Sequence, residues 1–292
     1  MEISLALGGG GSRGYAHLGV LRCLEDEGFK IRAVAGTSAG GIMAVAYASG
    51  YRPDELEQLF VDLDQSKLFA RSAEEGPGIL GLYGASRVFE KFFGERTFAD
   101  LRIPCAVVAV DLKNGREIVL KSGRLVDALL ATIAVPGVFP PQRLGNIYLV
   151  DGAVLDPVPV SVARSLARGL PTVAVVLAIS NEATSGLNSL PLPVQVPAPI
   201  VERLTRTRIA QAFNIFLQSV DVSSRMLAEM RLLSDNPDVI IRPDVNGIGL
   251  LDKVDVHEIV RLGEVAARES LPQLRQVVAW PARLRRTFFR RS

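Results

Sequence analysis

Apolar and polar residues alternate in two distinct ways along the first sixty positions. Short continuous apolar runs predict buried strands, and segments whose apolar residues recur every three or four positions predict covering helices. The predicted strands are 3–7 and 31–35, and the predicted helices are 15–27, 39–49 and 54–64. Strands that alternate with helices are typical of a parallel sheet with helices on its faces, so we expect an α/β fold.

The same two patterns continue through the rest of the chain. The further predicted strands are 105–110, 116–120, 147–152, 172–179 and 239–242. The further predicted helices are 125–134, 161–168, 255–276 and those within 201–233. The first two of these strands flank the turn "KNG", so we expect them to pair with each other.

Two segments fit neither pattern. The segment 69–93 is rich in glycine and aromatic residues, and we expect a mobile cap or substrate-facing segment, with ordinary loop-and-helix packing as the alternative. The segment 181–200 is rich in proline and poor in charge, which predicts a long loop. We therefore expect one domain over 1–276, followed by a tail over 277–292.

Composition and charge narrow the classes of protein. Of the 292 residues, 48% are hydrophobic and 22% are charged, which indicates an ordered globular chain. The net charge of +2 gives no indication of nucleic-acid binding. Positive charge gathers in the last ten residues, "RLRRTFFRRS", which include two phenylalanines. Such a tail could lie on an anionic membrane surface, or it could be a solvated, frayed terminus.

Location and metal binding can also be predicted from the sequence. The two cysteines, Cys23 and Cys105, do not form a disulfide framework, and we expect them to be buried thiols in a reducing compartment. We find neither a signal peptide nor an apolar run long enough to span a membrane. We therefore expect a cytoplasmic protein, with peripheral membrane contact through the tail. No residue cluster requires a metal, and we expect no cofactor.

The stretch "GGGGSRG" (8–14) concentrates glycine between the first strand and the first helix. The spacing Gly9-x-Gly11-x-x-Gly14 fits a dinucleotide-binding loop, but the next strand lacks the acidic residue that would hold a ribose. A Walker loop is excluded because no Gly-Lys-Ser/Thr follows. The glycines fit an oxyanion hole, in which the N–H groups of Gly10 and Gly11 face a carbonyl oxygen, with plain tight-turn packing as the alternative.

The pentapeptide "GTSAG" (36–40) follows the second predicted strand and begins a helix. It fits G-x-S-x-G, in which a serine nucleophile occupies a sharp strand-to-helix turn. A small-residue turn without chemistry is the alternative, and the strand–turn–helix setting favours the nucleophile. Ser38 is therefore the candidate nucleophile, and the helix N-terminus beside it favours negative charge.

A serine nucleophile needs a base, and the chain offers two histidines and one well-placed aspartate. The order Ser38, Asp151, His257 would suit an α/β-hydrolase triad, but His257 lies in an amphipathic helix whose polar face explains it. His17 is adjacent to the glycine loop, where a packing role is the simpler interpretation. Asp151, in "YLVDGAVLDPVP", follows an apolar strand and can act on a serine directly. A β-turn at Asp-Gly is the alternative.

Taken together, these motifs resemble the patatin-like phospholipases, particularly the bacterial cytoplasmic members. The shared blocks, in order, are "GGGGSRG", "GTSAGG", "DLKNGREIVL", "AVPGVFPP" and "LVDGAVLDPVPV". The resemblance is specific over 5–178 and weaker to about residue 274. It implies a three-layer α/β/α fold with a mostly parallel sheet.

The resemblance also implies roles for individual residues. Ser38 would be the nucleophile and Asp151 its base, and Arg13 would lie beside the substrate headgroup. The oxyanion hole would be formed by Gly10 and Gly11, with Gly9 as their neighbour. The block "DGA" replaces the commoner "DGG", a minor departure.

We therefore expect a serine acyl hydrolase of lipid esters, of the phospholipase A or lysophospholipase type, which contacts phospholipid and needs no metal. Two alternatives remain at this stage. One is a cytosolic esterase or thioesterase that acts on soluble acyl esters. The other is a non-catalytic regulatory protein that keeps the fold and binds lipid. The sequence does not define the headgroup, acyl length or oligomeric state.

Overall fold

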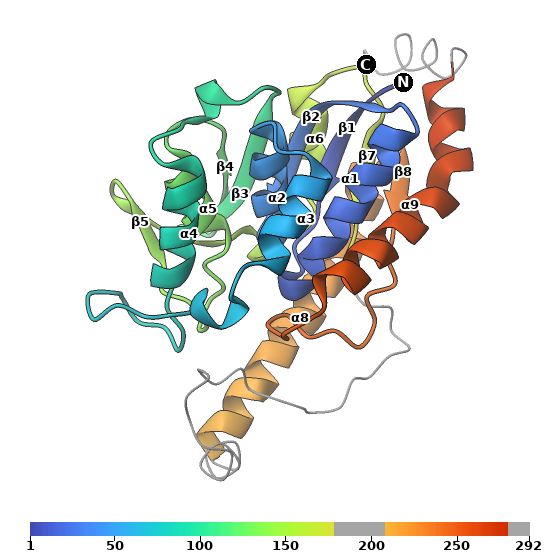
Figure 1. Cartoon of the computed structure of the whole chain (residues 1–292). Helices are drawn as coiled ribbons and strands as arrows, with labels where there is room; N and C mark the ends of the chain where they lie inside the picture. The colour runs from blue at the N-terminus through green and yellow to red at the C-terminus, as the bar shows by residue number, and fades with distance from the viewer. Residues whose placement is uncertain (178–207, 280–292) are drawn as a thin grey trace.

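The computed structural model describes residues 1–177 and 208–279, and within these residues eight strands form one sheet (Figure 1). The strands are β1 (Glu2–Leu7), β2 (Lys30–Thr37), β3 (Cys105–Asp111), β4 (Arg116–Leu120), β5 (Gln142–Leu144), β6 (Ile147–Asp151), β7 (Thr172–Val175) and β8 (Val239–Ile241). Their order is β5-β6-β3-β2-β1-β7-β8, with β4 also paired to β3. The strands from β3 to β8 in this order are parallel, whereas β4 and β6 run antiparallel to β3.

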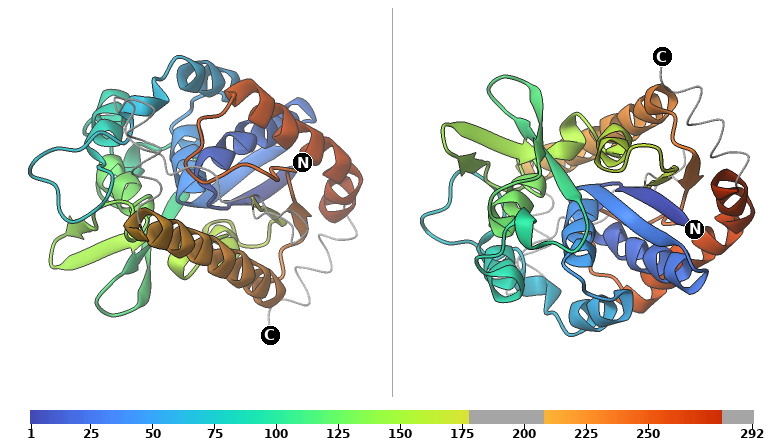
Figure 2. Two further views of the ribbon diagram at one scale, coloured as in Figure 1. Left: turned by 90° about the horizontal axis from the view of Figure 1, so that it is seen from below. Right: turned by 90° about the horizontal axis from the view of Figure 1, so that it is seen from above.

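Helices cover both faces of the sheet (Figure 2). The α-helices are α1 (Ala16–Asp26), α2 (Ala39–Ala48), α3 (Pro53–Val61), α4 (Tyr83–Phe93), α5 (Leu125–Thr132), α6 (Val160–Leu166), α8 (Arg208–Asp235) and α9 (Val256–Val278). The larger layer, which includes α1, α2 and α9, packs on one face, and α6 and α8 pack on the other. The expected fold class, a mostly parallel α/β sheet between helices, is confirmed.

The two faces of the sheet carry side chains of different size. Large residues of β1, such as Leu5 and Leu7, belong to the larger core. On the opposite face, alanines form a continuous row across β7, β1, β2 and β3, because neighbouring registers align Ala174, Ala6, Ala35 and Ala106. These small side chains allow α6 to pack close to the sheet, where it contacts all four strands.

Most predicted elements are present, with changes at their ends. The glycine loop leads into a 3₁₀ helix (Gly11–Tyr15), so α1 begins at Ala16 rather than at residue 15. The short β5 was not predicted; it pairs with β6, and three residues without strand alternation leave no pattern. Within 69–93, only Tyr83–Phe93 is helical. The predicted loop 181–200, residues 201–207 and nearly all of the tail lie outside the described residues.

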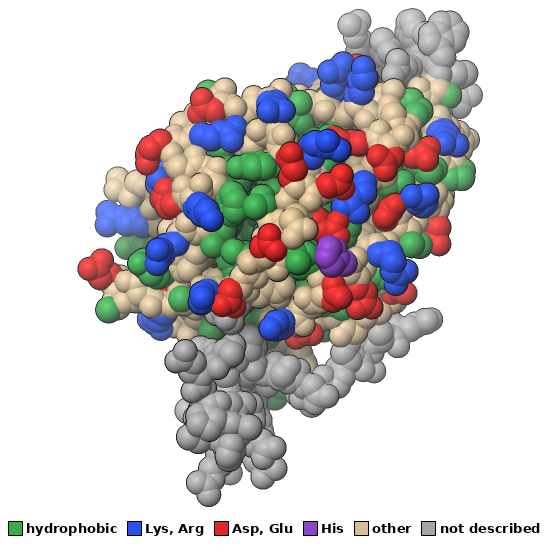
Figure 3. Space-filling view, viewed as in Figure 1, with side chains coloured by type: hydrophobic (Ala, Val, Ile, Leu, Met, Phe, Trp, Pro, Cys, Tyr) green, Lys and Arg blue, Asp and Glu red, His purple; other side chains and the backbone are tan. Residues whose placement is uncertain are grey.

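Over the described ranges 1–177 and 208–279, no helix is both long enough and apolar enough to cross a membrane. On the face seen in Figure 3, acidic and basic side chains are interspersed rather than separated by sign. Both cysteines are buried and free, as expected.

Candidate active site

The two motifs rich in glycine meet because their strands are neighbours. β1 and β2 are parallel, and Leu7 is in register with Gly36. The glycine loop after β1 and the serine turn after β2 therefore leave the same edge of the sheet. This is the edge at which ligands bind in open parallel sheets.

Hydrogen bonds fix the start of the glycine loop and leave its centre open. The Gly8 N–H donates to the Val175 carbonyl (2.9 Å) and the Gly9 N–H to the Pro157 carbonyl (3.0 Å). No acceptor within the described residues is found for the N–H groups of Gly10 and Gly11. These two N–H groups are thus available to a ligand, whereas that of Gly9 is not.

Close packing explains why three of these positions must be glycine. A Cβ at Gly11, whose φ is +57°, would lie 1.9 Å from the Leu250 carbonyl oxygen. A Cβ at Gly10 would lie 2.9 Å from the Cβ of Leu177, and one at Gly14 would lie 2.6 Å from that of Ala39. Real contacts between carbon atoms are longer than this, so a larger residue would push the loop out of place.

Ser38 occupies a strained turn between β2 and α2. Its φ and ψ are 54° and −125°, which only a few non-glycine residues adopt. Its N–H donates to the Thr132 hydroxyl (2.9 Å), which in turn donates to the Val108 carbonyl (2.6 Å). The Ser38 residue is 8% exposed, so its hydroxyl reaches the cleft from a nearly buried position.

Asp151 ends β6 and lies beside Ser38. It is 2% exposed, and its Oδ1 accepts a hydrogen bond from the Ala153 N–H (2.8 Å). Burial raises the pKa of Asp151 to about 6, although hydrogen bonds from the Ser38 side chain and the Ala153 N–H oppose the rise. The Asp151 carboxyl group therefore has a raised pKa of about 6 and lies close enough to the Ser38 side chain for that side chain to favour its ionised form.

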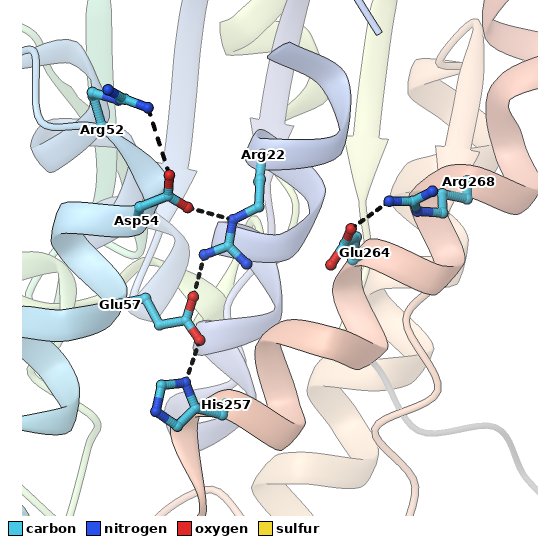
Figure 4. Close-up of polar contacts among 7 residues, drawn as sticks. All are labelled: Arg22, Arg52, Asp54, Glu57, His257, Glu264 and Arg268. Atoms are coloured by element: carbon cyan, nitrogen blue, oxygen red, sulfur yellow. Dashed lines mark hydrogen bonds and ion pairs between the residues drawn. The ribbon is translucent and has the colours of Figure 1, made fainter. Parts of the chain in front are cut away.

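Neither histidine pairs with Ser38. His257 lies in α9 with its side chain 62% exposed, and its Nδ1 is 2.5 Å from Oε1 of Glu57, which also pairs with Arg22 (Figure 4). His17 is completely buried, and its Nε2 is 2.8 Å from the Gly8 carbonyl oxygen. Burial lowers the pKa of His17 to about 4, so its ring is neutral near pH 7 and donates from Nε2.

Arg13 differs from the expected headgroup contact. Its side chain is 4% exposed, and its Nη1 is 3.3 Å from Oδ1 of Asp221 in α8. Its Nε also donates to the Ile248 carbonyl (2.7 Å). The arginine is turned toward partners within the chain because α8 and the loop after β8 close over it.

A broad open cleft of about 2870 Å³ contains the two candidate catalytic groups and the glycine loop. Apolar side chains from several helices and loops form much of its lining: Ile42, Met43, Phe60, Phe69, Val88, Phe89 and Phe139. Phe69, Val88 and Phe89 of this lining come from the segment 69–93. Among the described residues, no group of three His, Cys, Asp or Glu side chains could hold a metal ion.

Two contributors to the site could not be recognised in the sequence. Thr132, at the end of α5, holds the backbone of Ser38, but a single threonine at a helix end carries no distinctive pattern. The loop over 248–252 packs on the glycine loop, where Ser12 Oγ donates to the Asp252 carbonyl (2.7 Å). Contacts over more than 200 positions leave no local signal in a single sequence.

Comparison with known proteins agrees with this geometry. The family model described as "Patatin-like phospholipase" matches residues 5–164, more than half of the chain. The chain belongs to the patatin-like phospholipase family. The matched segment includes the glycine loop, the serine turn and Asp151, and it ends before α8 and α9.

Similar curated proteins include two that are described as uncharacterized NTE family proteins. An NTE family protein of Mycobacterium tuberculosis is 34% identical over 179 residues, covering 60% of this chain and 49% of the relative. A second is 29% identical over 286 residues, covering 92% of this chain and 46% of the relative. The chain thus spans about half the length of these relatives. A patatin-like phospholipase domain-containing protein of Caenorhabditis elegans is 33% identical over 177 residues, covering 56% of this chain and 13% of the relative.

The fold of this patatin-like chain also matches a solved structure. The crystal structure of VipD from Legionella pneumophila superposes with a TM-score of 0.54, covering 92% of this chain and 66% of that protein. Sequence identity in that superposition is 14%, so the similarity concerns the fold alone.

Proposed function

We propose that this protein is a serine acyl hydrolase of lipid esters in which Ser38 is the nucleophile and Asp151 the general base. The observation that carries the proposal is the placement of the buried Asp151 carboxyl group beside the Ser38 side chain, which occupies a strained strand-to-helix turn. Family membership supports lipid ester substrates, and the apolar lining of the cleft suits an acyl chain.

The first half of the reaction forms an acyl-enzyme. Asp151 accepts the proton of the Ser38 hydroxyl as its oxygen attacks the ester carbonyl carbon. The negative charge that develops on the carbonyl oxygen is stabilised by the N–H groups of Gly10 and Gly11. When the tetrahedral intermediate collapses, the ester C–O bond breaks, and Asp151 returns the proton to the departing alcohol oxygen.

The second half regenerates the enzyme. A water molecule gives its proton to Asp151 and attacks the carbonyl carbon of the acyl-serine. The same N–H groups stabilise the second oxyanion, and the fatty acid leaves as the proton returns to Ser38. No step requires a histidine, which agrees with the placement of His17 and His257 outside hydrogen-bonding contact with Ser38.

One experiment tests the proposed function. Wild type, Ser38→Ala and Asp151→Asn are incubated with phospholipids, lysophospholipids, triglyceride and short nitrophenyl esters, and released fatty acid or nitrophenol is measured. Losing either group of a catalytic pair should reduce the rate by about 10³-fold or more on every substrate that wild type cleaves. Equal rates in wild type and Ser38→Ala would refute the proposal.

A further inference from the structure

The outer face of α8 carries an exposed apolar stripe. Its members are Ile215 (59% exposed), Val222 (54%), Met226 (61%), Met230 (60%) and Leu233 (84%). They follow one another at intervals of seven, four, four and three residues. At 3.6 residues per turn these positions fall within an arc of about 80°, and the stripe is about 27 Å long.

The opposite face of α8 attaches the helix to the body of the protein. Ala228 and Leu232 are buried in the smaller core against the sheet, and Asp221 pairs with Arg13 of the glycine loop. The stripe therefore lies on the exposed side of α8, where its members Val222 and Met226 also line the cleft that contains Ser38. The ion pair connects this helix to the candidate active site. Figure 1 shows α8 extending well beyond the edge of the sheet.

We propose that this stripe, Ile215 to Leu233 on α8, is the surface by which the protein docks on a lipid bilayer. This inference rests on the proposed function, since a lipid hydrolase must meet its substrate at such a surface. Leu217, Asp221 and Arg225 of the same helix line the cleft that contains Ser38. A bilayer under the stripe would thus lie beside the cleft, and a lipid could enter it directly.

The size of the stripe favours a bilayer over a second copy of the chain. Burying one aliphatic side chain removes roughly 100 Å² of apolar surface from water, so five partly exposed ones offer on the order of 400 Å². A stable protein–protein interface buries about 800 Å² on each partner. Partial insertion of an amphipathic helix into a bilayer has no such requirement for a complementary surface.

The charges of α8 predict which bilayers it prefers. The stripe itself contains no charged residue, and the charged side chains beside it are paired: Glu229 with Arg242, and Arg225 with Asp221. Binding should therefore depend on apolar contact rather than on anionic lipid. Zwitterionic phosphatidylcholine should suffice, and added salt should have little effect.

Flotation of the full chain with phosphatidylcholine vesicles tests the proposal. The variant Met230→Asp/Leu233→Asp places two charges on the stripe, at positions outside the cleft lining. The control Ser234→Asp/Val265→Asp adds the same charge at exposed positions off the stripe, one on the same turn of α8 and one on α9. We expect the stripe variant to lose about tenfold or more in vesicle binding, and the control less than about twofold.

Three results would overturn the docking proposal: absence of wild-type binding, equal binding by the stripe variant, or a solution dimer that only the stripe variant dissociates. Hydrolysis of a short soluble nitrophenyl ester by the stripe variant should match wild type, because the stripe takes no part in the chemistry. Failure of the proposed function would be seen separately, as soluble ester hydrolysis that survives Ser38→Ala.

Discussion

The Asp151 carboxyl group lies in a buried environment that disfavours its negative charge. It is almost completely buried, which disfavours its ionised form, whereas the Ser38 side chain and the Ala153 N–H favour that form. The resulting pKa of about 6 keeps it ionised at neutral pH yet basic enough to accept a proton from serine. Burial thus gives this aspartate a property that catalytic bases need.

The first prediction concerns the pH dependence of the reaction. Only ionised Asp151 can accept the Ser38 proton, so kcat/KM should fall about tenfold per pH unit below the pKa of about 6 and level off above it. His17, whose pKa is about 4, should add no step between pH 5 and 8. The measurement is kcat/KM on a soluble ester from pH 4.5 to 8.5. A rate that is constant through pH 6 would contradict this role.

The second prediction concerns stability. The pKa of Asp151 is about 6 in the folded protein and about 4 when unfolded, so the folded state binds more protons between these values. Folding stability from this group is present at low pH and is lost as pH rises from about 4 to about 6. Asparagine does not titrate, so the Asp151→Asn variant does not lose this stability as the pH rises. The free energy of unfolding of the variant minus that of wild type should therefore increase by up to about 3 kcal/mol from pH 4 to pH 8.

Urea unfolding of both proteins at the two pH values checks the stability prediction. The variant should be inactive while it gains relative stability, a trade-off typical of active sites. A stability difference between the proteins that is the same at pH 4 and pH 8 would contradict the raised pKa.

The close packing of helices α1 and α9 depends on a glycine in each helix. A Cβ at Gly19 would lie 1.9 Å from the Val260 carbonyl oxygen, and one at Gly263 would lie 1.9 Å from that of Ala16. The two backbones approach closely at reciprocal positions. This contact joins α9, which lies outside the matched family segment, to the first helix of that segment.

The third prediction is that Gly19→Ala strongly destabilises the protein. The added methyl group must push the helices apart, which should cost about 3 kcal/mol in the free energy of unfolding. Glu269→Ala, at an exposed position of α9, serves as the control and should change that energy by less than about 0.5 kcal/mol. Similar denaturation midpoints for Gly19→Ala and wild type would show that the helices can separate without cost.

The sequence predicted elements best where one face is apolar and the ends are marked. The strands 3–7 and 116–120 and the helix 39–49 are present nearly as predicted, because apolar runs and terminal glycines define them. It could not place the start of α1, where a 3₁₀ turn replaces the first helical residues. Nor could it reveal the crossing at Gly19, because glycine within a helix has no local signature.

On the scale of the whole molecule, a buried ion pair joins parts of the chain that are far apart in sequence. Arg13 of the glycine loop pairs with Asp221 of α8, and their side chains are 4% and 20% exposed. The glycine motif that contains Arg13 could be recognised in the sequence. The packing of α8 over Arg13 could not, because more than 200 residues separate Arg13 from Asp221. The motifs of the site were recognisable because each is local, whereas the contacts that hold them together are not.

The fourth prediction concerns this pair. Asp221→Ala leaves the Arg13 guanidinium buried without its carboxylate partner, which should cost about 3 kcal/mol of unfolding free energy. The double variant Arg13→Met/Asp221→Leu should recover much of that loss, since neither charge is then buried. Glu264→Ala, which breaks the more exposed pair with Arg268, should cost less than about 1 kcal/mol. If the double variant loses the sum of the losses measured for Arg13→Met alone and Asp221→Leu alone, the residues do not act as a pair.

The proposed reaction depends on the acylation of Ser38 during catalysis. The most direct measurement is mass spectrometry of the protein after rapid acid quench during turnover of a nitrophenyl ester, followed by peptide mapping. We expect an added mass equal to the acyl group on the peptide that contains Ser38, absent from Ser38→Ala and from Asp151→Asn. Acylation of another residue, or turnover by Ser38→Ala at the wild-type rate, would contradict it.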